Sequence, residues 1–537
     1  MRMVSKQDLK NILGQIPLTA EAYWYLRQPG KPVTPEFALE RLEQSIPEWR
    51  TQVMSSKVYS SLNRSRSSNG HNHVFIFATL RYWLEHATLL GMSLAGQGHS
   101  VSLSYLPYAR WQAPIDAFNL RRQNVYAENI LSKTAPLLRI VPLLSQSKAT
   151  RLPSELLNSI DLVSLRDTQY TLQVEEVSLE SELYKLRLHR NQSAAIAAFS
   201  YLRRHNPDII ILPNGTILEF GVIYQVARFL GIPTVTYEFG EQRDRIWLAQ
   251  NAEVMRQDTS DLWKAHQNQP LSEDQLSLVC RLFSSRQRGS LWENFARRWQ
   301  GVPSEGGAQV LQTLGLDQRP IVLLATNVIG DSLTLGRQVF SDSMTEWLER
   351  TVKYFAIRPD VQLVVRIHPG ELITKGPSVA DVVRKALPAI PEHIHLVPAD
   401  AKVNTYDIVE IADLGLVYTT TVGMEMAMSG VPVVVVGNTH YRAKGFTSDP
   451  QSWEAYFELL NEMLAAPRSY RLSQPQVEQA WNYAYRFFFE YPQPFPWHLV
   501  HFWKDLETWP LSRLLNDEDL SGYRRTFSYL VGEPIGW

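Results

Sequence analysis

The sequence has almost no cysteine, since Cys280 is the only one among 537 residues. A single thiol cannot build a disulfide framework within the chain or supply a cysteine-based zinc cluster. No stretch approaches the length of uninterrupted apolar residues that a membrane-spanning helix needs, so we expect no such helix. The opening residues, MRMVSKQDLKNILG, lack the apolar core of a secretory signal. We therefore expect a cytoplasmic protein.

The chain also lacks an excess of charge of either sign. Its 53 Lys and Arg residues nearly balance its 54 Asp and Glu residues, and the formal net charge is −1. This balance gives no overall attraction to nucleic acid, so we expect no nucleic-acid partner. Hydrophobic residues make up 45% and charged residues 20%, which is typical of globular domains with a substantial core. The length predicts roughly two to four domains.

Several common motifs of nucleotide and metal sites are missing. The sequence contains no GxxxxGK[ST] loop, no GxGxxG after a strand pattern and no HExxH. Its Asp-x-Asp pattern, Asp517 and Asp519, lies in a polar stretch near the C-terminus and not at the end of a strand. We therefore expect no diphosphate site built on a chelated metal, and no bound metal or cofactor.

The first half of the chain contains two strand–helix–strand patterns. HVFIFAT at 73–79 is an apolar run suited to a strand buried on both faces, and a helical pattern separates it from a second strand pattern at 100–107. The same order returns at 207–237, whereas 110–205 is more polar and mainly helical in pattern. The Ser-, Asn- and Arg-rich stretch at 60–72 indicates an exposed linker. These units predict a parallel sheet.

The second half repeats this alternation at short spacing from RPIVLLATN at 319–327 to VPVVVVG at 431–437. We place the connection between the two halves at the Gly-rich GVPSEGGA, 301–308. The pattern predicts an α/β fold of two doubly wound, Rossmann-like domains that face a cleft at the carboxyl ends of their strands. We expect an N-terminal helical extension with linker at 1–72 and a first Rossmann-like domain with helical insertions at 73–308. A second Rossmann-like domain at 309–475 and an aromatic-rich crossover segment at 476–537 would follow.

The first candidate motif is RIHPGE, which begins at Arg366 where the strand pattern 361–367 ends. Pro369 ends the strand, so His368 should project from the sheet edge where open α/β sheets bind ligands. Arg366 and His368 are suited to binding a phosphate, and we expect Pro369 and Glu371 of the same loop to contact the nucleotide sugar as well. The alternative is a turn histidine beside a surface arginine.

The second candidate motif is YTTTVGME, which joins an apolar strand to a helix. Thr419, Thr420 and Thr421 place hydroxyls there, and Thr420 or Thr421 can cap the helix while donating to an anion. Gly423 would let a ligand come close. Glu425 could accept from ribose hydroxyls, or it is simply a favourable charge at a helix N-terminus.

The third candidate motif is the basic loop GNTHYRAKGFT, which contains Arg442 and Lys444 and directly follows VPVVVVG. A single basic loop is usually just solvated. Three anion-favouring loops after successive strands of one domain predict a phosphate-bearing ligand, and we expect a nucleotide.

RIHPGE followed by YTTTVGMEMAMSGVPVVVVGNTHYRAKGFT resembles the C-terminal half of bacterial capsule polysaccharide biosynthesis glycosyltransferases, a group that includes Kdo transferases. Its His-Pro and Ser/Thr motifs are also similar to those of bacterial sialyltransferases. The resemblance is good over 319–450 and limited to pattern in the first half. It implies a GT-B fold whose C-terminal domain holds the donor nucleotide and whose N-terminal domain holds the acceptor.

The resemblance also implies roles for individual residues. His368 would contact the donor's nucleotide phosphate, and Thr420 and Thr421 would contact it too. The relatives have Ser-Ser or Ser-Thr where this chain has three threonines, which leaves open which hydroxyl acts.

An inverting sugar transfer needs a base for the acceptor hydroxyl and stabilisation of the departing phosphate. The resemblance suggests a carboxylate of the N-terminal domain as the base, and our candidate is Glu238 in VTYEFGEQ, with Glu241 and Asp244 as rivals. Glu238 also has a purely structural interpretation. His368 and Arg366 would stabilise the phosphate, and this scheme requires no metal.

The aromatic residues, 15 Trp, 23 Tyr and 20 Phe, are concentrated near the C-terminus. The segment 481–509 contains 12 of them in 29 positions. It is either a platform for a membrane surface or lipid-linked acceptor, or a crossover segment that packs on the first domain. Its few Lys and Arg residues favour packing.

Together these patterns predict a cytoplasmic, metal-independent and inverting GT-B glycosyltransferase. Its partners would be a nucleotide-sugar donor and an acceptor that is a surface or capsular polysaccharide or a glycolipid. A lipid-linked acceptor would bring it to the inner face of the membrane as a peripheral protein. The alternatives are a nucleotide-sugar epimerase of the same two-domain fold and a non-catalytic glycan-assembly protein.

Overall fold

Two sheets, one of seven strands and one of five, organise the chain. The structure is a computed structural model that describes residues 6–56, 59, 72–147, 151–292 and 301–537. The chain forms two units, of which the first comprises 1–168, 178–255 and 493–536 and the second 169–177, 256–492 and Trp537. The linker expected at 60–72 lies, apart from Asn72, outside the described residues.

The sheet of the first unit has the strand order β12-β6-β5-β4-β1-β2-β3. Its strands are β1 His73–Thr79, β2 Ser100–Leu106, β3 Leu138–Pro142, β4 Ile209–Pro213, β5 Thr234–Glu238, β6 Arg245–Gln250 and β12 Gln493–Pro494. The strands β1 to β5 run parallel, whereas β6 and β12 add an antiparallel edge. The apolar run of β1 is buried except at its first residue, as expected of a strand covered on both faces.

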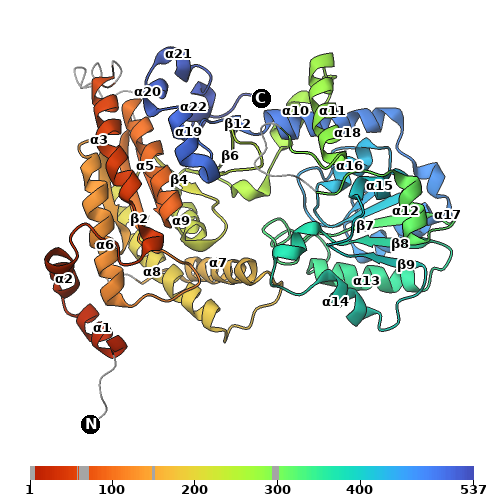
Figure 1. The fold of residues 1–537 in the computed structure, drawn as a ribbon, viewed down its shortest axis with the longest axis horizontal. Helices are drawn as coiled ribbons and strands as arrows, with labels where there is room; N and C mark the ends of the chain where they lie inside the picture. The colour runs from red at the N-terminus through yellow and green to blue at the C-terminus, as the bar shows by residue number, and fades with distance from the viewer. Residues whose placement is uncertain (1–5, 57–58, 60–71, 148–150, 293–300) are drawn as a thin grey trace, which may run out of the picture. The chain divides into compact units, whose positions relative to one another are not determined.

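Helices cover both faces of this sheet. Those of the first unit are α1 Lys6–Gln15, α2 Thr19–Arg27, α3 Glu40–Ser55, α5 Arg81–Gly96, α6 Ala117–Leu131, α7 Ser154–Leu172 (whose last residues belong to the second unit), α8 Glu182–His205, α9 Leu218–Phe229, α19 Phe502–Thr508, α20 Leu511–Leu514, α21 Asp517–Leu520 and α22 Arg524–Leu530. Figure 1 shows α3 and α5 side by side, and α5 packs on β1 and β2. The parallel strands and these helices share one large apolar core.

The sheet of the second unit is parallel throughout and has the order β11-β10-β7-β8-β9. Its strands are β7 Ile321–Ala325, β8 Gln362–Arg366, β9 Ile394–Val397, β10 Leu414–Val417 and β11 Val433–Val435. Because parallel strands end at the same edge, the residues that follow β7, β8 and β10 come together there.

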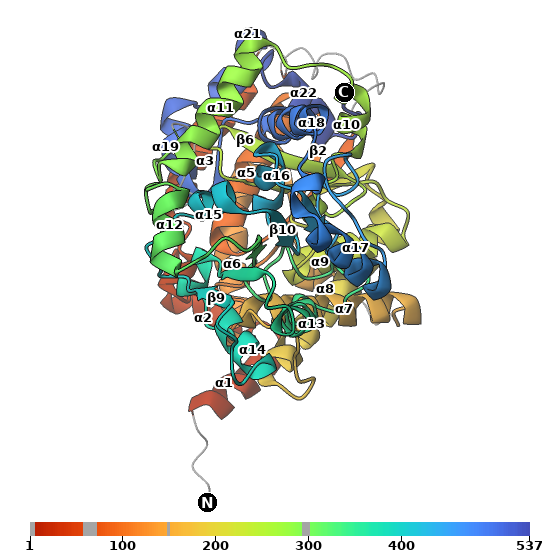
Figure 2. The ribbon, with the colours of Figure 1, turned by 90° about the vertical axis from the view of Figure 1, so that its right-hand side faces the viewer.

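The helices of the second unit lie on both faces of its sheet. They are α10 Ser260–His266, α11 Glu273–Gln287, α12 Gly307–Leu314, α13 Met344–Ala356, α14 Val379–Ala386, α15 Thr405–Ile411, α16 Val422–Met428, α17 Trp453–Ala465 and α18 Gln474–Tyr485. Figures 1 and 2 show α13 and α14 on one face and α15 and α16 on the other. Trp347 on α13 and Tyr456 on α17 anchor the core of the first face.

The observed elements confirm the predicted α/β class and its doubly wound sheets. Three strands, β3, β6 and β12, lie where the sequence pattern indicates helix or makes no prediction. All three are short strands at or next to an edge of the first sheet, and in β6 only Ile246 and Leu248 are buried. The segment 301–308 lies inside the second unit, where the backbone N–H of Glu305 donates to Asp407 of α15 at 2.8 Å.

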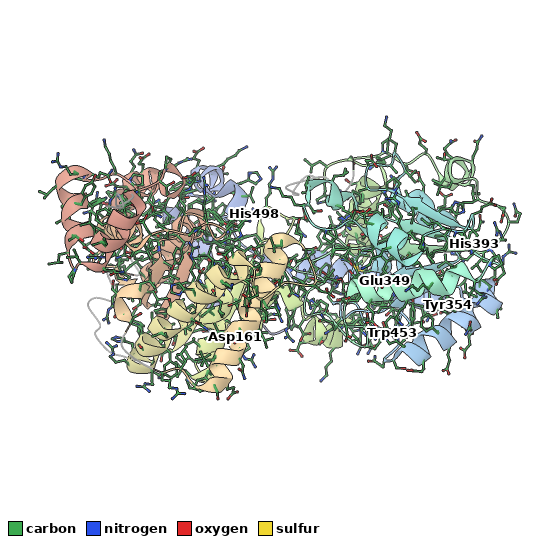
Figure 3. All side chains as sticks on the ribbon, turned by 90° about the horizontal axis from the view of Figure 1, so that it is seen from below. Asp161, Glu349, Tyr354, His393, Trp453 and His498 are labelled. Atoms are coloured by element: carbon green, nitrogen blue, oxygen red, sulfur yellow. The ribbon has the colours of Figure 1, made fainter. Side chains whose placement is uncertain are left out.

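The aromatic segment 481–509 is divided between the units, because the chain leaves the second unit after Pro492. Phe487 and Tyr491 are buried in the second unit, and Phe495 and Trp497 are buried in the first. His498, labelled in Figure 3, accepts from the N–H of Val500 at Nδ1, so its Nε2 can donate to the Gly240 carbonyl 3.1 Å away. Across the described residues, no helix has the length and apolar composition needed to cross a membrane.

Candidate functional site

A buried arginine lies at the carboxyl end of the second sheet. Arg366 is the last residue of β8 and is 3% exposed. Its Nη1 donates to the Pro398 carbonyl at 2.6 Å and its Nε to Thr405 Oγ1 at 3.3 Å. No carboxylate within the described ranges forms an ion pair with it, and burial lowers its pKa to about 10. A buried cation without a counter-charge favours the binding of an anion beside it.

A small pocket that is open to solvent lies beside this arginine. Its lining comes from the ends of β7, β8 and β10 and from the start of α15: Ala325, Thr326, Arg366, His368, Pro369, Thr405, Tyr406, Thr420 and Val422. Four of the predicted site residues, Arg366, His368, Pro369 and Thr420, therefore meet in one pocket of the second unit. Pro369 contributes a wall and begins a short 3-10 turn.

The hydrogen bonds of His368 define its tautomer. The imidazole Nδ1 accepts from the backbone N–H of Gly370 at 2.9 Å. The backbone N–H of His368 donates to Thr326 Oγ1 at 3.2 Å. A neutral imidazole that accepts at Nδ1 carries its proton on Nε2. His368 can therefore present an N–H donor to an anion without first becoming charged.

The three threonines have different surroundings. The hydroxyl of Thr419 donates to the Leu333 carbonyl at 2.8 Å, and Asn327 holds its backbone N–H. Thr420 lines the pocket, while Thr421 is half-buried at the start of α16 and makes no side-chain cap there. Of the three threonines, Thr420 is the one that lines the pocket.

Glu425 is held by an ion pair inside the second unit. Arg286 of α11 donates to Glu425, and the two side chains are 3% and 2% exposed. Burial raises the pKa of Glu425, although Arg286 and the hydroxyl of Tyr406 act in the opposite direction. Tyr406 also lines the pocket, so this neutralised pair lies directly behind the pocket wall.

Two further predicted residues support the loops around the pocket. A Cβ at Gly423 would lie 2.4 Å from the Tyr441 hydroxyl, so packing against Tyr441 requires glycine there. Tyr441 in turn donates to the Thr420 carbonyl at 2.5 Å. Glu371 accepts from the backbone N–H of Val379 at 3.2 Å, and burial raises its pKa.

The basic loop after β11 lies outside the pocket lining. Arg442 donates to the carbonyls of Val435 and Pro450, which ties the loop to the end of its own strand. Lys444 is half-buried, and burial lowers its pKa in spite of Asp258 nearby.

Sequence reasoning missed three polar residues of the pocket lining, namely Thr326, Thr405 and Tyr406. Thr326 directly follows the apolar run of β7, so the rule that ligands bind at carboxyl strand ends would have found it. Thr405 and Tyr406 begin α15, and Asn404 caps that helix by accepting from the N–H of Tyr406 at 2.8 Å. Nothing in their local pattern distinguishes them from other helix starts.

The candidate base lies in the first unit. Glu238 is the last residue of β5, and its side chain is half-buried. Burial raises its pKa, and hydrogen bonds from the N–H of Phe239 and from Asn214 act against that rise. Of its rivals, Glu241 is half-buried, and Asp244 is 57% exposed at the start of β6.

Three non-glycine residues with positive φ lie at the same edge of the first sheet. Leu80 follows β1 with φ 65°, and Asn214 and Leu218 follow β4 with φ 55° and 53°. Each residue of this kind costs about 1–3 kcal/mol, and such residues cluster at functional sites. Because β1, β4 and β5 are neighbours, this strain lies beside Glu238.

Within the described part of the chain, no group of three His, Cys, Asp or Glu side chains is arranged to hold a metal ion.

Comparisons with known proteins give distant matches only. No protein-family model matches the sequence, and no curated protein matches it. Among solved structures, KpsC, the β-Kdo 2,4-transferase of Thermosulfurimonas dismutans, is similar at 14% identity over 54% of this chain and 83% of that chain, with a TM-score of 0.33. The calicheamicin glycosyltransferase CalG4 is similar at 14% identity over 82% and 98%, with a TM-score of 0.25. The UDP-GlcNAc 2-epimerase of Neisseria meningitidis is similar at 13% identity over 76% and 97%, with a TM-score of 0.24. These are remote similarities of fold to GT-B proteins that include both transferases and epimerases.

Proposed function

We propose that this protein is a glycosyltransferase that moves a sugar from a nucleotide-activated donor to an acceptor hydroxyl. The second unit would bind the donor through its phosphate, and Glu238 of the first unit would act as the base. The motif resemblance supports a surface or capsular polysaccharide or a glycolipid as acceptor. Transfer would proceed with inversion.

The proposal rests mainly on the burial of Arg366. A buried guanidinium without a carboxylate partner costs free energy in the empty protein, and a bound phosphate offsets that cost. The fork of Arg N–H groups suits two phosphate oxygens at once. The proton on His368 Nε2 and the hydroxyl of Thr420 add two donors in the same pocket.

In the proposed reaction, the acceptor oxygen attacks the anomeric carbon of the donor sugar. Its proton passes to the Glu238 carboxylate, while the bond between the anomeric carbon and the phosphate oxygen breaks. The electron pair of that bond stays on the phosphate, where Arg366 and His368 stabilise the added charge. A base pKa above the ordinary glutamate range brings it closer to neutral pH, where general bases act best.

The first test is a thermal-shift screen with CMP, CDP, UDP and GDP. A ligand present at 100 times its Kd stabilises the protein by about 2.7 kcal/mol. We expect one nucleotide to raise the unfolding midpoint, and the corresponding nucleotide sugar to be turned over. His368→Ala should lose donor hydrolysis and transfer, whereas His189→Ala, at an exposed position of α8, should keep both. Unchanged turnover in His368→Ala would show that the phosphate is bound elsewhere.

A further inference from the structure

The carboxylate of Glu238 is held by two N–H groups, one for each oxygen. Oε1 accepts from the backbone N–H of Phe239 at 3.0 Å, and Oε2 accepts from Asn214 Nδ2 at 3.1 Å. The Phe239 contact is local to the turn. The Asn214 contact comes from the neighbouring strand and is the one that sets the direction of the side chain.

The orientation of the Asn214 amide is fixed by a second bond. Its Oδ1 accepts from the backbone N–H of Thr216 at 3.0 Å, so its NH2 group must face Glu238. The backbone N–H of Asn214 also donates to the Tyr237 carbonyl at 2.8 Å, which extends the β4–β5 pairing by one residue. The amide therefore has one direction available to it.

This arrangement requires unusual backbone conformations in the turn. Asn214 has φ 55°, a value that Asn adopts more readily than most residues, and Gly215 follows with φ 79°. A Cβ on Gly215 would lie 2.6 Å from Thr236 Cγ2 on β5, so only glycine lets the turn lie this close to the strand. The close approach is what brings the Asn214 amide within reach of Glu238.

We propose that Asn214 is a positioning residue for Glu238: its amide aims the carboxylate and favours the ionised form that can accept a proton. The inference rests on the proposed function, because it assigns Asn214 a role in preparing the base. Nothing in the sequence pattern of the turn identifies this role, since PNG is also a common turn sequence.

The effect can be separated from other charges near Glu238. The ionisable groups on the elements around it include Tyr237 on its own strand, Glu241, Arg243 and Asp244 in the following turn, Arg245 on β6, and Glu253, whose Cα lies near Gly215. The imidazoles of His86 and His498 also pack on the ring of Phe239. Tyr237 titrates far above neutral pH, because burial and Glu238 both raise its pKa. Substitution of Asn214 leaves all of these groups in place.

The test measures the ionisation of Glu238 directly. The full-length protein is labelled with 13C at the glutamate carboxyl carbon, and the Glu238 signal is identified by its loss in Glu238→Gln. Asn214→Gly keeps the positive φ and removes the amide, so the Glu238 titration should move up by about one pH unit. Asn214→Asp keeps the acceptor for Thr216 but places a second carboxylate beside Glu238, and we expect a rise of about two units.

Asn251→Gly is the matched control. Asn251 also has a positive φ of 54°, and its Oδ1 also accepts a backbone N–H, that of Thr234, at 3.0 Å. Its amide makes no contact with Glu238 that the structure records, so the Glu238 titration should stay where it is in the wild type. An unchanged titration in Asn214→Gly, or an equal change in Asn251→Gly, would overturn the inference.

The same variants separate this inference from the proposed function. If Glu238→Gln abolishes sugar transfer while Asn214→Gly leaves the titration unmoved, the base is correct and the role of Asn214 is wrong. If Asn214→Gly moves the titration but Glu238→Gln transfers sugar normally, the contact is real but Glu238 is not the base. Support for the positioning role requires both the moved titration and the same upward shift in the acid limb of the kcat/KM profile of Asn214→Gly.

Discussion

Replacing Arg366 with methionine should weaken anion binding without weakening the fold. Methionine keeps much of the volume of the side chain and removes its charge. The pKa of Arg366 is lowered to about 10 from 12.5 by burial, so keeping it charged costs the empty protein roughly 3 kcal/mol. Methionine escapes this cost but gives up the hydrogen bonds to Pro398 and Thr405, which contribute about 1 kcal/mol each. The free energy of unfolding of the empty variant should therefore stay the same or rise.

Binding should change far more. A guanidinium and a phosphate about 4 Å apart attract each other by about 4 kcal/mol at the effective dielectric of a partly buried site. Allowing for a water molecule that replaces part of this contact, we expect nucleotide affinity to fall by roughly 2–4 kcal/mol, or about 30- to 1000-fold. Isothermal titration calorimetry with the nucleotide found by the screen measures this loss, and chemical denaturation without ligand measures the stability.

Arg384→Met is the control for this prediction. Arg384 lies on α14 with a 64% exposed side chain and pairs only with Asp381 at the surface. The Arg384→Met variant should bind the nucleotide as the wild type does. The reasoning is refuted if Arg366→Met binds the nucleotide with unchanged affinity, or if the empty variant is several kcal/mol less stable than the wild type.

Three further predictions follow from the surroundings of the pocket. Thr420→Val should lower nucleotide affinity by about 1–2 kcal/mol with little change in the free energy of unfolding. Thr419→Val should mainly lower stability, because it leaves the Leu333 carbonyl without its donor. Calorimetry and denaturation on both variants distinguish them, and a reversed pattern would contradict the assignment. Gly423→Ala should destabilise by about 1–3 kcal/mol in chemical denaturation, because its Cβ would lie 2.4 Å from the Tyr441 hydroxyl, whereas Gly522→Ala has open space around it and should be neutral. Arg286→Met should cost about 3–5 kcal/mol of stability, because it leaves Glu425 buried without its partner. The double variant Arg286→Met/Glu425→Gln should recover most of that loss. A double variant as unstable as the single one would mean that Arg286 acts through packing alone.

The sequence predicted the fold well where the strands are central and apolar. The runs at β1, β4, β7 and β8 are buried on both faces, and burial on both faces produces an uninterrupted apolar pattern. The strands β3 and β6 lack such a run, because β3 is an edge strand and β6 is next to the edge.

The candidate site was predictable only in part. Arg366, His368 and Thr420 follow strand ends, and topology alone brings such residues to one edge. The partner of Glu425 could not be predicted, because Arg286 lies on a helix far away in the sequence and reaches it only in the folded unit. The same holds for Asn214 and Glu238, which meet through the pairing of β4 with β5.

The proposed base has a pH signature that can be checked independently. Burial raises the pKa of Glu238, and a general base is inactive once it is protonated. Activity should therefore fall as the pH drops through this raised pKa, at a higher pH than an ordinary glutamate would give, and the pH profile of kcat/KM measures this acid limb.

The most direct measurement of the central claim is product analysis of the nucleotide sugar with and without a glycan acceptor. We predict that the wild type links the sugar to the acceptor and releases the nucleotide, and that Glu238→Gln still binds the nucleotide but forms no product. Conversion of the nucleotide sugar to its epimer without an acceptor, or transfer by Glu238→Gln at the wild-type rate, would contradict this account.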